Sequence, residues 1–431
     1  MWPAPASGIT GPRLSGHVPG LDGVRGLAIL LVMAVHFVGD ATPEGPIERL
    51  AVKLGNYGAL GVDLFFVLSG FLITGLLLDA KGQTSYFRNF YARRTLRIFP
   101  LYYLVLTLLF LVAPHLVALP EGLEDARRHQ GWLWSYTANF YLAAKGTWAL
   151  TYVSHFWSLA VEEHFYLVWP LVVFCLGPRS LGRVCLAIVG GALLLRTGLS
   201  LAGVNEIALL VLTPCRVDAL AVGALMALVA RQEDGLDRLL RAARPALWVV
   251  GFAILVVSLW GASTGIGLAV LHPVRGTLFA VFFGALTLMS VHPGRSLLTQ
   301  AFNGRLLRMF GKYSYGLYVY HGVLAYYMTD LQVEARLSTI LGDHSAGMVA
   351  QAVVGVGLSL AIAALSYEQF EKRFLGLKRY FETARRAPAA PGREVIATTV
   401  LAHATGRATG DGAREQFGHH VGEPEPSMRI E

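Results

Sequence analysis

Long apolar stretches alternate with short polar and basic segments along most of the chain. Each stretch is about 20 residues long, which is the length that an α-helix needs to cross a hydrocarbon core of about 30 Å. We therefore predict an all-α integral membrane protein, a polytopic bundle of about ten transmembrane helices. The predicted spans cover residues 21–39, 59–78, 99–117, 157–176, 183–203, 208–229, 246–263, 271–291, 309–328 and 347–366.

The composition agrees with this class. Apolar residues make up 54% of the chain and charged residues 15%, and the mean hydropathy is +0.52. These values lie outside the range of soluble globular proteins. The three cysteines lie in or beside apolar stretches and lack zinc-type spacing. We therefore expect neither disulfide bonds nor a metal site.

The net charge of +8 reflects Lys and Arg residues that are spread through the short connections rather than gathered in one domain. This distribution predicts a topology signal and no nucleic-acid partner, because basic residues collect in cytoplasmic loops. An even number of spans then places both termini in the cytoplasm. We expect a multi-pass protein of the plasma or inner membrane with a cytoplasmic segment 1–20, a membrane domain 21–375 and a disordered cytoplasmic tail 376–431.

Two predicted outer segments, residues 40–57 and 118–156, are long for connections, and the second is rich in Trp and Tyr. Aromatic residues at this density usually mark the membrane interface. The alternative is a cover over a substrate groove, because sugar rings also favour aromatic surfaces.

Arg25 and His36 are ionisable residues within the first predicted span, where each needs a neutralising partner or a functional reason. They are eleven residues apart, so they project from one helix face about 16 Å from each other. A long ligand with a phosphate-rich head and a reactive end, such as a coenzyme A thioester, fits this spacing. A snorkelling Arg and a hydrogen-bonded structural His would give the same pattern.

A second basic group, Arg93, Arg94 and Arg97, precedes the third predicted span. Arg94 and Arg97 share a helix face. Guanidinium groups bind phosphates in bidentate fashion, so the group is a candidate for the phosphates of coenzyme A. Ordinary cytoplasmic charge or contact with anionic lipid is the competing interpretation.

The fourth predicted span carries two adjacent carboxylates, Glu162 and Glu163. Glu162 shares a helical stripe with Tyr166. It could orient a catalytic imidazole or hold a substrate hydroxyl, or it could serve as the counter-ion of Arg216 or another buried cation. Ser69 lies in a small-residue motif, where helix packing is the default role. A nucleophilic serine would need a nearby base and a G-x-S-x-G turn, which this segment lacks.

Six motifs occur in order between about residues 20 and 375, and together they resemble the acyltransferase-3 family of membrane acyltransferases. They are LDGVRGLAILLVMAVHF at 21–37, GVDLFFVLSGFLI at 61–73, YARRTLRIFPLYY at 91–103, FWSLAVEEHFYLVWP at 156–170, CRVDALAVGAL at 215–225 and YSYGLYVYH at 313–321.

The resemblance implies a ten-helix bundle that takes an acyl group, often acetyl, from cytoplasmic acyl-coenzyme A and delivers it to a hydroxyl at the outer face, commonly on a glycan. It assigns the family's first-helix Arg and His to Arg25 and His36, and its arginine pair to Arg94 and Arg97. Arg93 is an additional basic neighbour.

We accordingly expect His36 to act as general base or to carry the acyl group, and Glu162 to orient it or to bind the acceptor. Acyl-coenzyme A, with acetyl as the expected group, a hydroxylated acceptor and the lipid bilayer are the expected partners. Two alternatives stay open: a small secondary metabolite such as a macrolide sugar as acceptor, and a transporter whose buried charges line a pathway. The residues expected to contact the substrate are Ser69, Trp157, Glu163, Tyr166 and His321.

Overall fold

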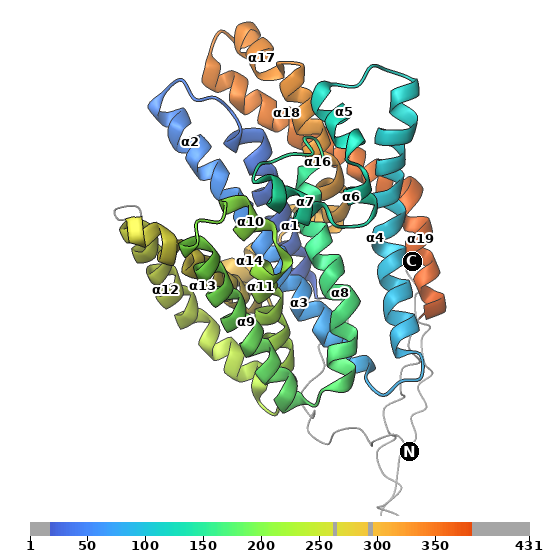
Figure 1. Cartoon of the computed structure of the whole chain (residues 1–431), viewed down its shortest axis with the longest axis vertical. Coiled ribbons are helices and arrows are strands. Elements are labelled where there is room, and N and C mark those ends of the chain that lie inside the picture. The colour runs from blue at the N-terminus through green and yellow to red at the C-terminus, as the bar shows by residue number, and fades with distance from the viewer. Residues whose placement is uncertain (1–17, 262–264, 292–295, 382–431) are drawn as a thin grey trace, which may run out of the picture. The chain divides into compact units, whose positions relative to one another are not determined.

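The computed structural model describes residues 18–261, 265–291 and 296–381, and these residues form helices and connections without a strand (Figure 1). Nine helices in this part of the chain are long and apolar enough to cross a membrane. The prediction of an all-α polytopic membrane protein is therefore confirmed. The termini fall largely outside the described residues, namely 1–17 of the predicted first segment and 382–431 of the predicted tail.

The long helices overlap the predicted spans. Their bounds are α1 (Pro19–Ala34), α3 (Leu60–Ala80), α4 (Tyr86–Thr107), α8 (Trp157–Cys175), α9 (Pro178–Leu201), α11 (Thr213–Val229), α12 (Gly235–Gly261), α13 (Gly265–Ser290) and α18 (His344–Ser366). Several are extended by neighbouring turns, such as the π-helical turn η1 (Val35–Gly39) after α1 and the short helix α10 (Glu206–Val211) before α11. However, α4 begins 13 residues before its predicted span 99–117, and α12 begins 11 residues before its predicted span 246–263.

The predicted span 309–328 differs from the structure. Tyr313 divides it into α15 (Arg305–Lys312) and α16 (Ser314–Asp330). α15 carries basic residues on one face of a short amphipathic helix, which suits the membrane interface better than the hydrocarbon core. α16 has 17 residues, slightly fewer than the roughly 20 that a perpendicular crossing needs, and it packs against α1 and α18.

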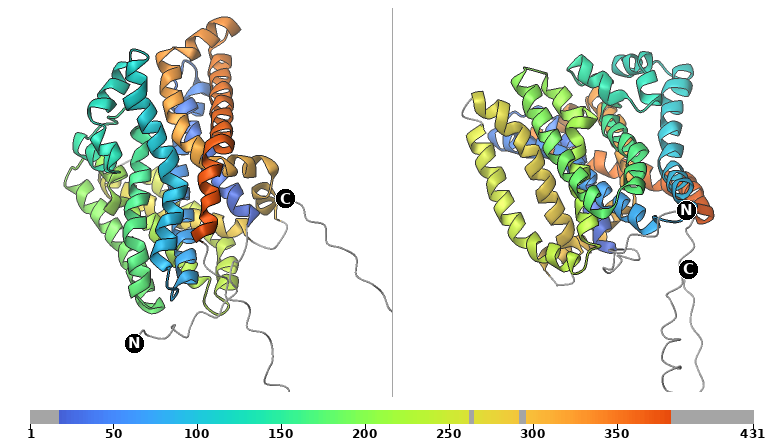
Figure 2. Two further views of the ribbon diagram at one scale, coloured as in Figure 1. Left: turned by 90° about the vertical axis from the view of Figure 1, so that its right-hand side faces the viewer. Right: turned by 60° about the horizontal axis from the view of Figure 1, so that its bottom comes forward.

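The connections lie at two opposite ends of the bundle (Figure 1). One end, the upper end in Figure 1, carries α2 (Pro46–Asn56), α5 (Glu121–Arg128) and α17 (Val333–Leu341), and the other carries the connections 81–85 and 176–177. α4 rises from the lower end and contacts α19 (Lys372–Gly376), and both views of Figure 2 show the C-terminal helices beside it.

α3 and α11 pack closely because two glycines face the partner's backbone. A Cβ added to Gly70 would collide with the carbonyl of Leu220, and one added to Gly223 would collide with the carbonyl of Val67. Small residues permit this close approach of membrane helices. The motif around Ser69 therefore has a packing role, in addition to the expected contact between Ser69 and the substrate.

Buried ion pairs join the same helices. Arg216 of α11 donates to Asp63 of α3 at 2.7 Å, and both side chains are less than 10% exposed. Arg196 of α9 donates to Asp218 of α11, also at 2.7 Å. Arg216 thus finds its counter-ion in Asp63, and the alternative role of Glu162 as the partner of Arg216 is wrong.

Candidate active site

Two cavities lie among the central helices. The first, of about 570 Å³, is lined by Arg25, Arg93, Arg94 and Arg97, and we call it the basic cavity. The second, of about 850 Å³, contains His36 and is called the histidine cavity. Both volumes fall within the usual range for small-molecule sites, roughly 300–1,000 Å³.

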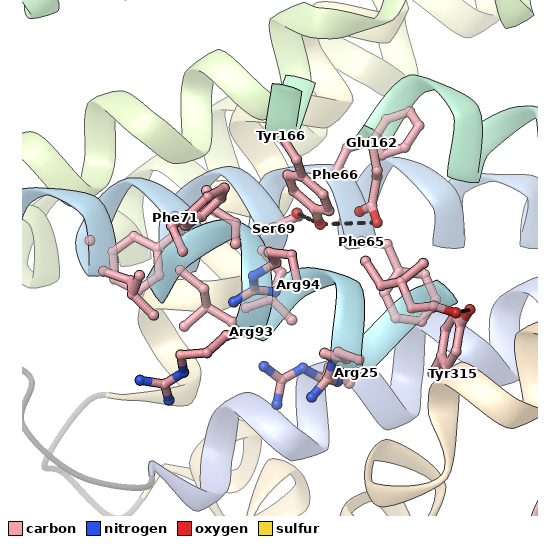
Figure 3. A pocket seen from close by; sticks show the side chains of 18 of the residues that line it. Arg25, Phe65, Phe66, Ser69, Phe71, Arg93, Arg94, Glu162, Tyr166 and Tyr315 are labelled. Atoms are coloured by element: carbon pink, nitrogen blue, oxygen red, sulfur yellow. Dashed lines mark hydrogen bonds between the residues drawn. The ribbon is translucent and has the colours of Figure 1, made fainter. Parts of the chain in front are cut away.

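Four of the five arginines that line the basic cavity come from two helices, α1 and α4 (Figure 3), and the fifth, Arg231, is bound to Asp79 at 2.7 Å. Of the four, Arg25 projects from α1, where it binds Asp22 at 2.6 Å, and the other three project from α4. In the described part of the chain no carboxylate lies within ion-pairing distance of Arg93, Arg94 or Arg97. The guanidinium carbon of Arg94 instead lies 5.7 Å from the centre of the Tyr166 ring. Three cations are thus left free to bind an anion.

Next to Arg94, the basic cavity contains a short series of hydrogen bonds (Figure 3). The hydroxyl of Ser69 lies 2.6 Å from that of Tyr166, which donates to Glu162 at 3.1 Å. Glu163 lines the same cavity, and its buried Oε1 has no hydrogen-bond partner among the described residues. This series of hydrogen bonds includes no imidazole that could activate Ser69. The Ser69 hydroxyl is therefore suited to polar contact with a ligand rather than to nucleophilic attack.

His36 lies on the π-helical turn η1, at the point where the regular hydrogen bonding of α1 ends. Such turns occur frequently at functional sites. The Nδ1 of His36 is 3.1 Å from a carboxylate oxygen of Asp40. A carboxylate only accepts, so Nδ1 carries the proton and Nε2 keeps a lone pair for chemistry. Asp40, and not Glu162, is the carboxylate that contacts His36.

Two further histidines surround His36. The ring centres of His36 and His321 are 5.1 Å apart, and that of His155 lies 6.3 Å from His36. His321 is fully buried, and its Nδ1–H donates to the carbonyls of Leu317 and Tyr318, which fixes its tautomer. Trp157 also lines the histidine cavity.

Tyr318 separates the two cavities. It lines both, a property that it shares only with Val62 among the residues lining them. Its hydroxyl donates to the carbonyl of His155 at 2.7 Å, so the hydroxyl of Ser158, 2.5 Å away, donates to the Tyr318 oxygen. One layer of side chains therefore stands between the arginines and His36.

The structure thus distributes the predicted site residues between two places. Arg25, the α4 arginines, Ser69, Glu162, Glu163 and Tyr166 surround the basic cavity, while His36, Trp157 and His321 surround or adjoin the histidine cavity. Sequence reasoning did not single out Asp40, His155 or Tyr318 for the site. Asp40 had a detectable signal, because residues four apart share a helix face. No sequence pattern indicated His155, because it lies in the short turn η5 (Ser154–Phe156) before α8 and outside the helical spacing of the other site residues.

Comparison with known proteins adds an independent line of information. A family profile described as an acyltransferase domain matches residues 18–368. The chain is 28% identical over 387 residues to the peptidoglycan O-acetyltransferase OatA of Listeria monocytogenes, which covers 85% of this chain and 57% of that protein. It is 26% identical over 341 residues to the O-acetyltransferase OatA of Staphylococcus aureus, covering 74% of this chain and 53% of that protein.

The chain spans about half the length of these curated relatives. No solved structure matches it. The family profile nevertheless covers most of the 431 residues, including the six motifs and every residue that lines the two cavities except Phe381. This chain therefore belongs to the acyltransferase-3 family of membrane O-acyltransferases.

Proposed function

We propose that the protein transfers an acetyl group from cytoplasmic acetyl-coenzyme A to a hydroxyl group of a cell-wall glycan at the outer face of the membrane. The observation that carries this proposal is the pairing of two adjoining cavities, one with unpaired arginines and one with a carboxylate-bound histidine. The names of the relatives supply the acetyl group and the glycan class.

The basic cavity binds the donor. Coenzyme A carries several phosphate groups, and planar guanidinium groups bind phosphate oxygens in pairs. Arg93, Arg94 and Arg97 have no ionic partner in the described structure and can neutralise this charge. The hydroxyls of Ser69 and Tyr166 offer polar contacts to the pantetheine arm beyond the phosphates.

The spacing of Arg25 and His36 matches the elongated shape of acetyl-coenzyme A. Eleven helical residues separate them, which corresponds to a rise of about 16 Å along α1 and its π-helical extension. The phosphates would stay near Arg25 while the pantetheine arm extends past Tyr318 toward His36. This path crosses the single layer of side chains between the cavities.

His36 performs the chemistry in this proposal. With its Nδ1 proton held by Asp40, Nε2 accepts the proton of the acceptor hydroxyl while the hydroxyl oxygen attacks the thioester carbonyl carbon. The carbon–sulfur bond then breaks, and the coenzyme A thiolate takes the proton from His36. General base catalysis of this kind contributes typically about 10²- to 10⁴-fold to the rate. An acyl-histidine intermediate would use the same nitrogen as nucleophile.

The proposed orientation follows from the donor. Acetyl-coenzyme A is cytoplasmic, so the basic cavity opens toward the cytoplasm and the histidine cavity toward the outside. Basic residues near the lower connections, such as Lys81 and Arg179, agree with a cytoplasmic lower end. If α16 completes a tenth crossing, both termini lie in the cytoplasm.

The experiment is transfer of label from acetyl-coenzyme A to isolated cell-wall glycan by the full-length protein in proteoliposomes. We expect His36→Ala to abolish transfer without lowering the amount of folded protein. His115→Ala is the matched control, because His115 is exposed and lines neither cavity.

Equal transfer by wild type and His36→Ala would contradict the assigned role of His36. If the wild type transfers no label while its relatives do under the same conditions, the enzymatic proposal fails and a carrier function becomes the better explanation.

A further inference from the structure

Among the described residues, the histidine cavity is lined by one arginine of the long membrane-span helices that has no partner within the protein. Arg275 lies on α13, ten residues after the helix begins at Gly265, and lines the cavity. In the described part of the chain it makes neither an ion pair nor a side-chain hydrogen bond. It is partly buried, so water does not solvate it fully.

Two other arginines that line the cavity, both on membrane-span helices, are neutralised. Arg196 is bound to Asp218 and Thr277, and Arg216 is bound to Asp63. The chain thus supplies counter-ions for two of three intramembrane arginines around this cavity and leaves the third facing the space where the acceptor enters. An unpaired charge within a membrane span is costly and usually functional.

The mouth of the cavity carries further positive charge. Arg49 and Lys53 of α2 line it, are exposed and have no ion pair within the described residues. The carboxylates that line the cavity are Asp40, Asp63 and Glu206, of which Asp40 binds His36 and Asp63 binds Arg216. Two exposed cations therefore lead inward to a third that is unpaired.

We propose that Arg275 binds an acidic group on the acceptor, so that the histidine cavity selects an anionic glycan over a neutral one. This inference rests on the proposed acetyl transfer to a glycan. A guanidinium binds carboxylate and phosphate equally well in bidentate fashion, so the acidic group is either a sugar carboxylate or a phosphate on the glycan. A neutral acceptor leaves Arg275 shielded from water without a partner, and the enzyme acetylates it more slowly.

The test uses the full-length protein in proteoliposomes with acetyl-coenzyme A and three soluble acceptors of equal length. One is a neutral oligosaccharide of N-acetylglucosamine, one carries carboxylates and one carries phosphates. We expect wild type to favour an acidic acceptor. We expect Arg275→Gln to lower kcat/KM for that acceptor by about 10- to 100-fold, chiefly through KM, which is the range for one charge-assisted pair.

The same substitution is expected to leave the KM for acetyl-coenzyme A unchanged and not to slow the acetylation of the neutral acceptor, because it removes the unpaired charge that this acceptor would shield from water. Arg275→Lys is expected to recover part of the loss with the acidic acceptor. Arg336→Gln is the matched control, because Arg336 is exposed on α17 and lines neither cavity. Preference for the carboxylated or the phosphorylated acceptor identifies the source of the charge.

An equal loss with neutral and acidic acceptors shows a structural role and overturns the inference. The inference is also overturned if the wild type acetylates acidic and neutral acceptors equally well. In that case acetylation of any of the glycans leaves the proposed function intact. Absence of transfer to all three acceptors and to isolated cell wall overturns both.

Discussion

The basic cavity and the histidine cavity differ in which of their arginines the chain provides with a counter-ion. In the first, Arg93, Arg94 and Arg97 have no ionic partner in the described structure, while the carboxylate of Glu162 is occupied by Tyr166. In the second, Arg196 and Arg216 are bound to aspartates, and Arg275 is the exception among the arginines of the long membrane-span helices that line it. The contrast shows that a buried arginine in this bundle is structural where the chain supplies its counter-ion. Where the chain supplies none, the arginine is available to a ligand.

The largest effect should follow from removing the free arginines together. The triple variant Arg93→Gln, Arg94→Gln, Arg97→Gln loses three charge-assisted contacts to phosphate, so we expect the KM for acetyl-coenzyme A to rise by about 1,000-fold or more. The measurement is steady-state transfer at saturating acceptor, together with binding of coenzyme A to the detergent-solubilised protein.

Two controls sharpen this prediction. Arg88→Gln removes an exposed charge from the same helix outside the cavity and should leave KM unchanged. A triple Lys variant keeps the charge but not the bidentate geometry and should bind with intermediate affinity. Unchanged coenzyme A binding in the triple Gln variant would mean that these residues serve topology alone, and the comparison between the cavities would fail.

A smaller effect, on kcat rather than on KM, is expected from Asp40→Asn. The amide cannot hold Nδ1–H of His36 as a carboxylate does, so the imidazole loses its fixed tautomer and kcat should fall by about 10- to 100-fold. Binding of coenzyme A should not change, because Asp40 lines only the histidine cavity. Asp343→Asn, at a helix start that lines neither cavity, is the control. A variant that weakens coenzyme A binding while keeping kcat would reverse the roles assigned to the two cavities.

The contents of the two cavities were predictable from sequence to different degrees. The three arginines of α4 that line the basic cavity lie within a segment of five residues, so a local pattern was enough to group them. Helical spacing also predicted that Arg25 and His36 lie on one face but far apart, and the structure places them in different cavities. These inferences need only the geometry of a single helix.

Contacts between helices could not be predicted in the same way. The expectation that Glu162 orients His36 required knowledge of how α8 packs against α1, and the structure places Glu162 in the other cavity. The link between Tyr318 and the residues before and within α8 joins positions about 160 residues apart. A periodic pattern carries no information on such pairs, because any helix face can in principle meet any other.

The smallest effect concerns the side chain that the cavities share. In Tyr318→Phe the hydrogen bonds to Ser158 and to the carbonyl of His155 are lost, while the aromatic ring and most of its packing remain. Loss of a neutral hydrogen bond costs about 0.5 to 1.5 kcal/mol. At the lower limit for each, the two bonds together cost about 1 kcal/mol, so the layer between the cavities should open more readily by about 5-fold. Water then reaches the thioester more often, and we expect acceptor-independent hydrolysis of acetyl-coenzyme A to rise by that factor.

Release of coenzyme A thiol in the absence of acceptor measures this leak directly. Tyr320→Phe is a matched control, because Tyr320 lies on the same helix, binds Ser366 and lines neither cavity. If Tyr318→Phe slows transfer and leaves hydrolysis unchanged, its hydroxyl acts on the reaction itself. Tyr318 would then belong to the chemistry of the histidine cavity rather than to the wall that divides it from the donor.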